Sequence, residues 1–67
     1  MRVFLNERII ELLVPISLAR LITDERIIDT SGLAIAINSQ VIPKLSWSNT
    51  TLNENDRIII ITATAGG

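Results

Sequence analysis

The stretch "DRIIIITATAGG" at residues 56–67 places four consecutive isoleucines before a run of small residues that ends in two glycines. Branched aliphatic side chains favour strands, because their Cβ branches pack well on a pleated surface. Successive side chains of a strand point to opposite faces of the sheet. If Arg57 points to water, the isoleucines divide between the core (Ile58, Ile60) and the other face (Ile59, Ile61). We predict a last strand here and a flexible tail at residues 62–67.

Two more strands are expected at the start of the chain. "MRVFLN" at residues 1–6 alternates, with Phe4 on the face opposite to the apolar odd-numbered residues. "RIIELLV" at residues 8–14 is a second apolar run, and the short polar segment between the two predicts a hairpin. Pro15 should end the second strand, because proline has no N–H for the ladder.

A short helix is predicted after Pro15. Ser17 suits the N-cap position, and the apolar residues that follow it recur at helical spacing (Leu18, Leu21 and Ile22). Arg20 and Asp24 are then one turn apart on the solvated side. The pattern leaves the end of the helix open, with Gly32 as a plausible break.

The segment "LAIAIN" at residues 33–38 alternates again, with Ala34 and Ala36 on the outward face. A tight turn then leads into a very short strand that Pro43 stops. Residues 44–55 are rich in Ser, Asn and Thr and are expected to form a loop.

The order of elements is therefore strand, strand, helix, strand, short strand, strand. One helix covers one face of a sheet, so the sheet should curl around it. We expect a single α+β domain over residues 1–67, a roll whose mixed sheet has four to five strands and one main helix. A chain of 67 residues has room for one domain at most.

Composition excludes several classes of function. The chain has no Cys and no His, which removes thiolate ligands, disulfides and Ser–His or Cys–His catalytic pairs. Its carboxylates are dispersed, so no metal site is expected. Six basic and seven acidic residues are scattered, which argues against nucleic acid as a partner. No apolar run approaches the length of a membrane span, and the start lacks a signal-peptide pattern. A soluble, cytoplasmic protein is expected.

The element order and the Gly-Gly end are typical of the ubiquitin-like β-grasp domains. Within these, the chain resembles the ThiS family of sulfur carriers of thiamine biosynthesis over nearly its whole length. The likeness is strongest in "LAIAINSQVIP", in Trp47 shortly after Pro43, and in "LNENDRIIIITATAGG". One departure is Asn55-Asp56, where the family usually has Gly-Asp. Asn tolerates positive φ best among residues other than glycine, so the turn can survive.

The tail suits acyl activation. A terminal carboxylate on Gly67 is ionised at neutral pH and can attack the α-phosphate of ATP. A sulfur donor can then displace AMP from the acyl-adenylate and leave a thiocarboxylate. Gly66 and Gly67 lack Cβ atoms, so they can enter a narrow channel. The small residues before them, including Thr64 and Ala65, suit an extended peptide in a groove. The alternative is that Gly-Gly is only a frayed terminus.

The outward sheet face is the second candidate site, because contiguous exposed apolar area marks partner sites. We predict that it docks a partner through Phe4, Ala34, Ala36, Ile59 and Ile61. The alternatives are that the isoleucines of the last strand alternate in the opposite phase, or that a loop covers this face. Either would leave no exposed apolar patch. Two other features have simpler explanations. Trp47 is expected to plug a loop onto the core edge, and Glu54 and Asp56 to serve a turn rather than acid–base catalysis.

The resemblance implies a protein co-substrate that binds no cofactor and is not itself an enzyme. Its implied partners are an ATP-dependent adenylating enzyme of the ubiquitin-activating type, a sulfur-transfer enzyme and a thiazole synthase. A molybdopterin-synthase-like carrier, a carrier for another pathway, a protein modifier that forms isopeptide bonds, and a plain interaction domain remain as alternatives.

Overall fold

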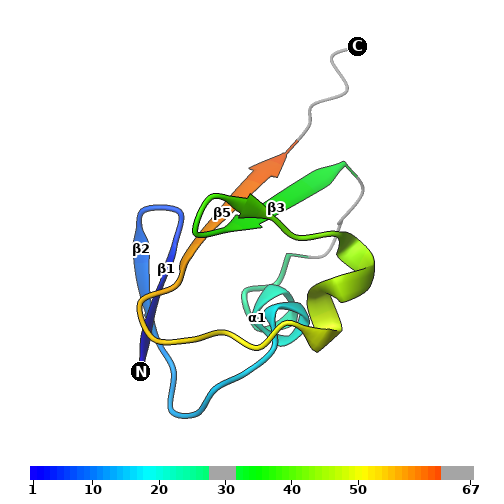
Figure 1. Ribbon diagram of the computed structural model, residues 1–67. Helices are drawn as coiled ribbons and strands as arrows, with labels where there is room; N and C mark the ends of the chain where they lie inside the picture. Colours follow the sequence, from blue (N-terminus) through cyan, green and yellow to red (C-terminus); the bar gives the residue numbers. More distant parts are fainter. Residues whose placement is uncertain (28–31, 63–67) are drawn as a thin grey trace.

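A computed structural model describes residues 1–27 and 32–62, and of Thr62 only the backbone. The chain forms one five-stranded sheet with one α-helix and one 3-10 helix (Figure 1). The spatial order of the strands is β2-β1-β5-β3-β4. The predicted α+β roll and the predicted order of strands and helix are confirmed. The elements are β1 (Arg2–Leu5), β2 (Arg8–Glu11), α1 (Leu18–Asp24), β3 (Leu33–Ile37), β4 (Gln40–Val41), η1 (Lys44–Asn49) and β5 (Arg57–Thr62).

The sheet is mixed, with β5 at its centre. β5 runs parallel to β1 and antiparallel to β3, while β2 and β4 pair antiparallel with β1 and β3. Two short hairpins therefore flank a central strand that comes last in the sequence (Figure 1). The fold depends on contacts between the first and last strands of the chain.

The core lies between α1 and one face of the sheet. The alternation predicted for β1, β3 and β5 is confirmed, because alternate residues of each strand are buried against the helix. Ile60 is half-buried at the edge of this core. The buried cluster consists of Val3, Leu5, Leu18, Leu21, Ile22, Ile35, Ile37, Trp47, Leu52 and Ile58.

Helix α1 has a defined start and a defined end. The Ser17 hydroxyl accepts a hydrogen bond from the Arg20 N–H at 3.0 Å, as the N-cap prediction requires. At the other end, the N–H of Ile27 donates to the Ile22 carbonyl at 3.1 Å, and Arg26 takes a positive φ of 60°. This is the Schellman arrangement that ends many helices, usually with glycine at the position of Arg26. The helix therefore ends well before Gly32.

Strand β2 is shorter than predicted. It ends at Glu11, and Leu13 and Val14 are exposed rather than part of a strand. The reason is that pairing with the neighbouring strand stops at Met1, which exchanges two 2.7 Å hydrogen bonds with Leu12. Beyond Leu12 the described chain offers the backbone no ladder partner, so Leu13 and Val14 lie outside the sheet.

The segment predicted as a loop after Pro43 contains the 3-10 helix η1. The helix carries Trp47 into the core, where the indole N–H donates to the Ile42 carbonyl at 2.9 Å. The prediction that Trp47 plugs this segment onto the core edge is confirmed. The polar residues of this segment give no helical pattern of apolar residues, because Trp47 is the buried residue of η1.

Candidate functional site

The face of the sheet opposite to α1 carries apolar side chains from all five strands. Cross-strand register aligns Phe4 with Ile9, Ala34 with Ile61, and Ala36 with both Ile59 and Val41. Residues aligned across strands share a face. The register therefore joins all five predicted docking residues of this face with Ile9 and Val41, and the full set is Phe4, Ala34, Ala36, Ile59, Ile61, Ile9 and Val41. We call this set the outer patch.

The outer patch is open to solvent at its centre. Ile59 and Ile61 are 41% and 57% exposed, whereas Ile58 between β1 and β3 is fully buried. The predicted phase of the last strand is confirmed. The small alanine side chains of β3 lie opposite the isoleucines of β5, so the isoleucine side chains project beyond those of the neighbouring strand. Ile9 and Val41 lie on the edge strands, where the short apolar runs around them do not reveal which face they occupy.

A cation borders the outer patch where β5 begins. The Arg57 guanidinium lies over the Phe4 ring, 5.4 Å from its centroid. A cation at this distance is attracted by the negative face of the ring. Phe4 is therefore half-buried, with the Arg57 guanidinium covering its ring. The exposed apolar part of the patch lies around Ile59 and Ile61, toward the end of β5.

The turn before β5 is built by side-chain amides and one buried carboxylate. Asp56 accepts hydrogen bonds from the Asn53 N–H at 2.8 Å and from the Asn38 side-chain amide at 3.0 Å. Asn55 has a φ of 68°, the positive value that a Gly-Asp turn would need. Glu54 is exposed and accepts from the backbone N–H of Arg2 at 2.8 Å. These contacts support the prediction that Glu54 and Asp56 serve the turn.

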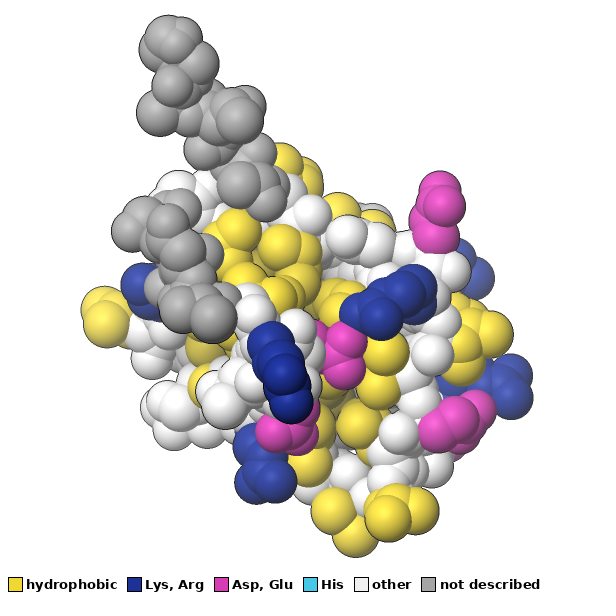
Figure 2. Space-filling view, turned by 180° about the vertical axis from the view of Figure 1, so that it is seen from behind, with side chains coloured by type: hydrophobic (Ala, Val, Ile, Leu, Met, Phe, Trp, Pro, Cys, Tyr) yellow, Lys and Arg dark blue, Asp and Glu magenta, His cyan; other side chains and the backbone are white. Residues whose placement is uncertain are grey.

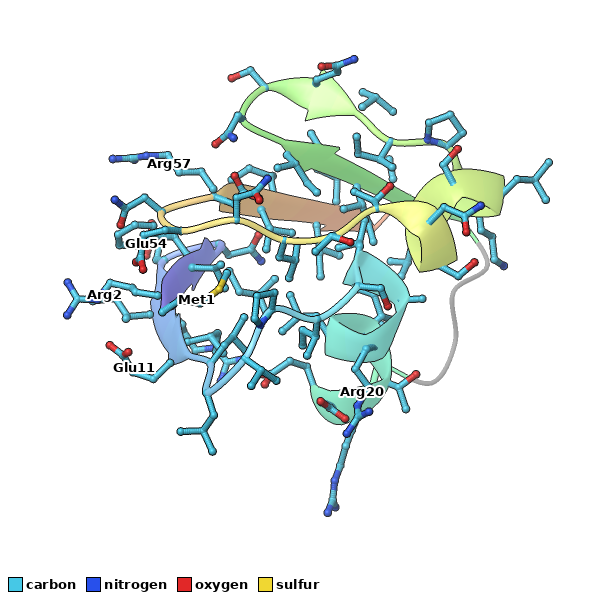
Figure 3. The ribbon with its side chains drawn as sticks, turned by 60° about the horizontal axis from the view of Figure 1, so that its bottom comes forward. Met1, Arg2, Glu11, Arg20, Glu54 and Arg57 are labelled. Atoms are coloured by element: carbon cyan, nitrogen blue, oxygen red, sulfur yellow. The ribbon has the colours of Figure 1, made fainter. Side chains whose placement is uncertain are left out.

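Charged side chains gather at the start of β5, away from the end of the strand at Thr62. Figure 3 shows Arg2, Glu11, Glu54 and Arg57 projecting at this end of the sheet. Arg2 pairs with Glu11 at 3.2 Å across the first hairpin. Exposed pairs of this kind contribute about 0–1 kcal/mol. This end carries a solvated, internally neutralised rim rather than a field of one sign.

On the face shown in Figure 2, basic and acidic side chains likewise alternate around exposed hydrophobic ones. Within the described residues, no group of His, Cys, Asp or Glu could hold a metal ion. No helix among them is long and apolar enough to cross a membrane.

A pocket of about 660 Å³ opens at the other end of β5, beside the turn between β1 and β2. Its lining combines apolar side chains with charged ones and comprises Leu5, Asn6, Glu7, Arg8, Glu25, Ile27 and Ile60. Arg8 and Glu25 form an ion pair that links β2 to the end of α1. No sequence pattern indicates this pocket, because its lining comes from three separate segments with no common motif.

Four predicted site residues, Thr64, Ala65, Gly66 and Gly67, lie outside the described residues. Their roles stay predictions. The structure does locate the point from which they extend, since β5 ends at Thr62 at the end of the sheet that also holds the β1–β2 turn. The exposed Ile61 and the pocket both border this point.

Comparisons with known proteins agree with this architecture. A family model described as the ThiS family matches residues 1–67. The crystal structure of a thiamine biosynthesis protein (ThiS) from Geobacter metallireducens is similar with a TM-score of 0.85 at 14% identity, over 100% of both chains. An NMR structure of a thiamine biosynthesis protein from the same organism has a TM-score of 0.78 at 14% identity, covering 100% of this chain and 88% of that one. No curated protein sequence matches the chain significantly.

Proposed function

The chain belongs to the ThiS family, and we propose that it carries sulfur on the carboxylate of Gly67 for thiazole formation in thiamine biosynthesis. Family membership supports the role of sulfur carrier in that pathway and of a protein that is acted upon rather than an enzyme. The structural observation that carries the proposal is the outer patch. Its most exposed side chains, Ile59 and Ile61, stand on the strand that leads directly into the tail.

The chemistry proceeds in two displacements. A carboxylate oxygen of Gly67 bonds to the α-phosphorus of ATP, and the bond to pyrophosphate breaks. A hydrosulfide equivalent from the sulfur-transfer enzyme then bonds to the acyl carbon, and AMP leaves with the electron pair. One proton is released, and a thiocarboxylate remains on Gly67. The chain supplies the acyl group, ATP supplies the adenylyl group, and a partner enzyme supplies the sulfur.

Two glycines before the reacting carbonyl suit this cycle. Without a Cβ atom, Gly66 and Gly67 let an enzyme's backbone close on the acyl carbon from both sides. The body of the domain then has one task, which is to dock so that the tail reaches the active site. The outer patch suits this task, because an apolar face rimmed by charges can bind and release successive enzymes.

Intact mass spectrometry tests the proposal. The purified chain is incubated with ATP, its cognate adenylating enzyme and a sulfur donor, and an alkylating trap then distinguishes a thiocarboxylate from oxidised Met1. We expect one trapped alkyl group on the C-terminal fragment. A chain with Gly67 as its C-terminal amide is the matched control and should stay unmodified. Unmodified wild type, or wild type joined to lysines of other proteins, would contradict the proposal.

A further inference from the structure

The two long edges of β5 are not equally covered. On one side β3 pairs with β5 along its whole later part, from Ile37 opposite Ile58 to Leu33 opposite Thr62. On the other side the pairing with β1 stops after Leu5 opposite Ile58. β5 continues beyond the β1–β2 turn, as Figure 1 shows. Its last residues therefore have a backbone neighbour on one side only, among the described strands.

The direction of the backbone groups on this uncovered edge follows from alternation. Asn6 donates its N–H to the Ile58 carbonyl, so the even-numbered residues of β5 direct their backbone groups toward β1. The N–H of Ile60 is satisfied by the side-chain oxygen of Asn6 at 2.9 Å. Next in line are the Ile60 carbonyl and the N–H and carbonyl of Thr62. We call this three-group stretch the open edge.

The pocket described above lies beside the open edge, since Asn6 and Ile60 line it. Its apolar surface comes from Leu5, Ile27 and Ile60, and its polar surface from the turn and the Arg8–Glu25 pair. An uncovered strand edge next to a pocket is the combination used in β-strand addition, where main-chain hydrogen bonds provide affinity and pockets provide specificity.

We propose that an extended segment of the adenylating enzyme adds to β5 at the open edge and places one long side chain in this pocket. The proposal rests on the proposed function, because it names the surface by which that enzyme holds the tail. The added strand would pair with residues 60–62 where β1 has ended. It would fix the root of the tail before the acyl group reacts.

The length of the tail favours the adenylating enzyme as the molecule that binds the open edge. Residues 63–67 are five in number, and an extended chain spans at most about 3.3–3.6 Å per residue, or about 17 Å in total. An enzyme that acts on Gly67 must therefore lie within about 17 Å of Thr62. The open edge ends at Thr62, so the bound enzyme lies within about 17 Å of it.

Substitution of Thr62 by proline tests the strand addition. Thr62→Pro deletes the N–H on the open edge, while the pairing with β3 uses the odd-numbered residues and stays intact. Proline also favours an extended conformation for Ile61, which that residue already has. We expect the KM of adenylation for Thr62→Pro to rise at least tenfold, with kcat within twofold. Thr62→Ala keeps the N–H, so its KM should lie well below that of Thr62→Pro, which separates loss of the N–H from loss of the side chain.

Amide hydrogen exchange provides a second readout on the unmodified chain. With saturating adenylating enzyme and no ATP, we expect exchange at the Thr62 amide to slow at least tenfold. An unchanged KM for folded Thr62→Pro, or an unprotected Thr62 amide in the complex, would overturn the strand addition alone. Failure of the enzyme to charge wild-type Gly67 would instead overturn the proposed function.

Discussion

The two ends of β5 are held in different ways. At its start, Arg57 exchanges hydrogen bonds with Asn38 on one side, and the neighbouring Asp56 carbonyl accepts from the Phe4 N–H on the other. At its finish, the Ile60 N–H donates to the side-chain oxygen of Asn6, and among the described strands only β3 pairs with the last residues. We call these the closed end and the open end.

The difference assigns the two ends of β5 to two tasks: one end stabilises the sheet, and the other is accessible to a partner. The closed end joins both hairpins to the central strand, so its hydrogen bonds stabilise the whole sheet. The open end combines an uncovered edge, a pocket and exposed isoleucines, which contribute little to the fold and are accessible to a partner. Variants at the closed end should therefore change stability without changing docking, and variants at the open end should do the reverse.

The largest effect on stability is expected at Asp56, at the closed end. Asp56→Ala removes a buried carboxylate that accepts hydrogen bonds from the Asn53 N–H and the Asn38 amide, and hydrogen bonds to charged groups contribute about 1.5–3 kcal/mol each. We expect the free energy of unfolding to fall by about 2–3 kcal/mol and the Tm by about 10–20 °C. Urea and thermal unfolding measure both.

Glu11→Ala is the matched control, because it removes an exposed carboxylate at the same end of the sheet. Its effect should stay within about 0.5 kcal/mol. If Asp56→Ala were as mild as this control, the closed end would not be the part that holds the sheet together. The claim that variants at the closed end change stability would then be wrong.

The sequence predicted the closed end better than the open end. Alternation in residues 33–38 and 56–62 placed the inward and outward side chains correctly, because burial of one face imposes a period of two. The tolerance of Asn55 for positive φ was also predictable from its residue type. Both features are local, and local chemistry is what a single sequence displays.

The open end depends on where strands stop, which is a tertiary property. The apolar run after Glu11 favours a longer strand, but the strand ends because the described residues offer no ladder partner beyond Leu12. Arg26 ends α1 in a conformation that glycine usually provides, so the sequence gives no signal there. The hydrogen bond from Ile60 to Asn6 joins residues 54 positions apart.

Docking is expected to fail when a charge enters the outer patch at the open end. Ile61→Asp places a carboxylate on a side chain that is 57% exposed, so folding should be nearly unaffected. We expect the KM of adenylation to rise at least tenfold, equivalent to about 1.4 kcal/mol of lost binding, because the charge must be desolvated in the complex. Steady-state kinetics measure the KM, and thermal unfolding checks the fold.

The control for this variant is Leu13→Asp, which adds the same charge at a fully exposed apolar side chain beyond the other end of the sheet. Its KM should match wild type. Equal impairment of both variants would indicate that net charge rather than the outer patch controls docking. Normal adenylation of folded Ile61→Asp would show that the patch is not the docking surface.

The smallest effect is expected at Ser39, in the turn between β3 and β4 at the closed end. Asn38 and Ser39 have φ values of 52° and 73°, so both central residues of this two-residue loop are left-handed, as in a type I′ turn. Glycine adopts such values without the steric cost of a Cβ atom. Ser39→Gly should therefore stabilise the domain by about 0.5–1 kcal/mol, measured by urea unfolding.

Ser48→Gly is the matched control, because Ser48 lies in η1, where φ is negative and glycine costs helical structures up to about 1 kcal/mol. The same chemical change should thus have opposite signs at the two positions. Adenylation kinetics of Ser39→Gly should equal those of wild type, because a tighter turn at the closed end leaves the open edge and the outer patch unchanged. A stabilised variant with altered kinetics would show that the two ends of β5 are coupled, and that rigidity at one end is transmitted along the strand to the other.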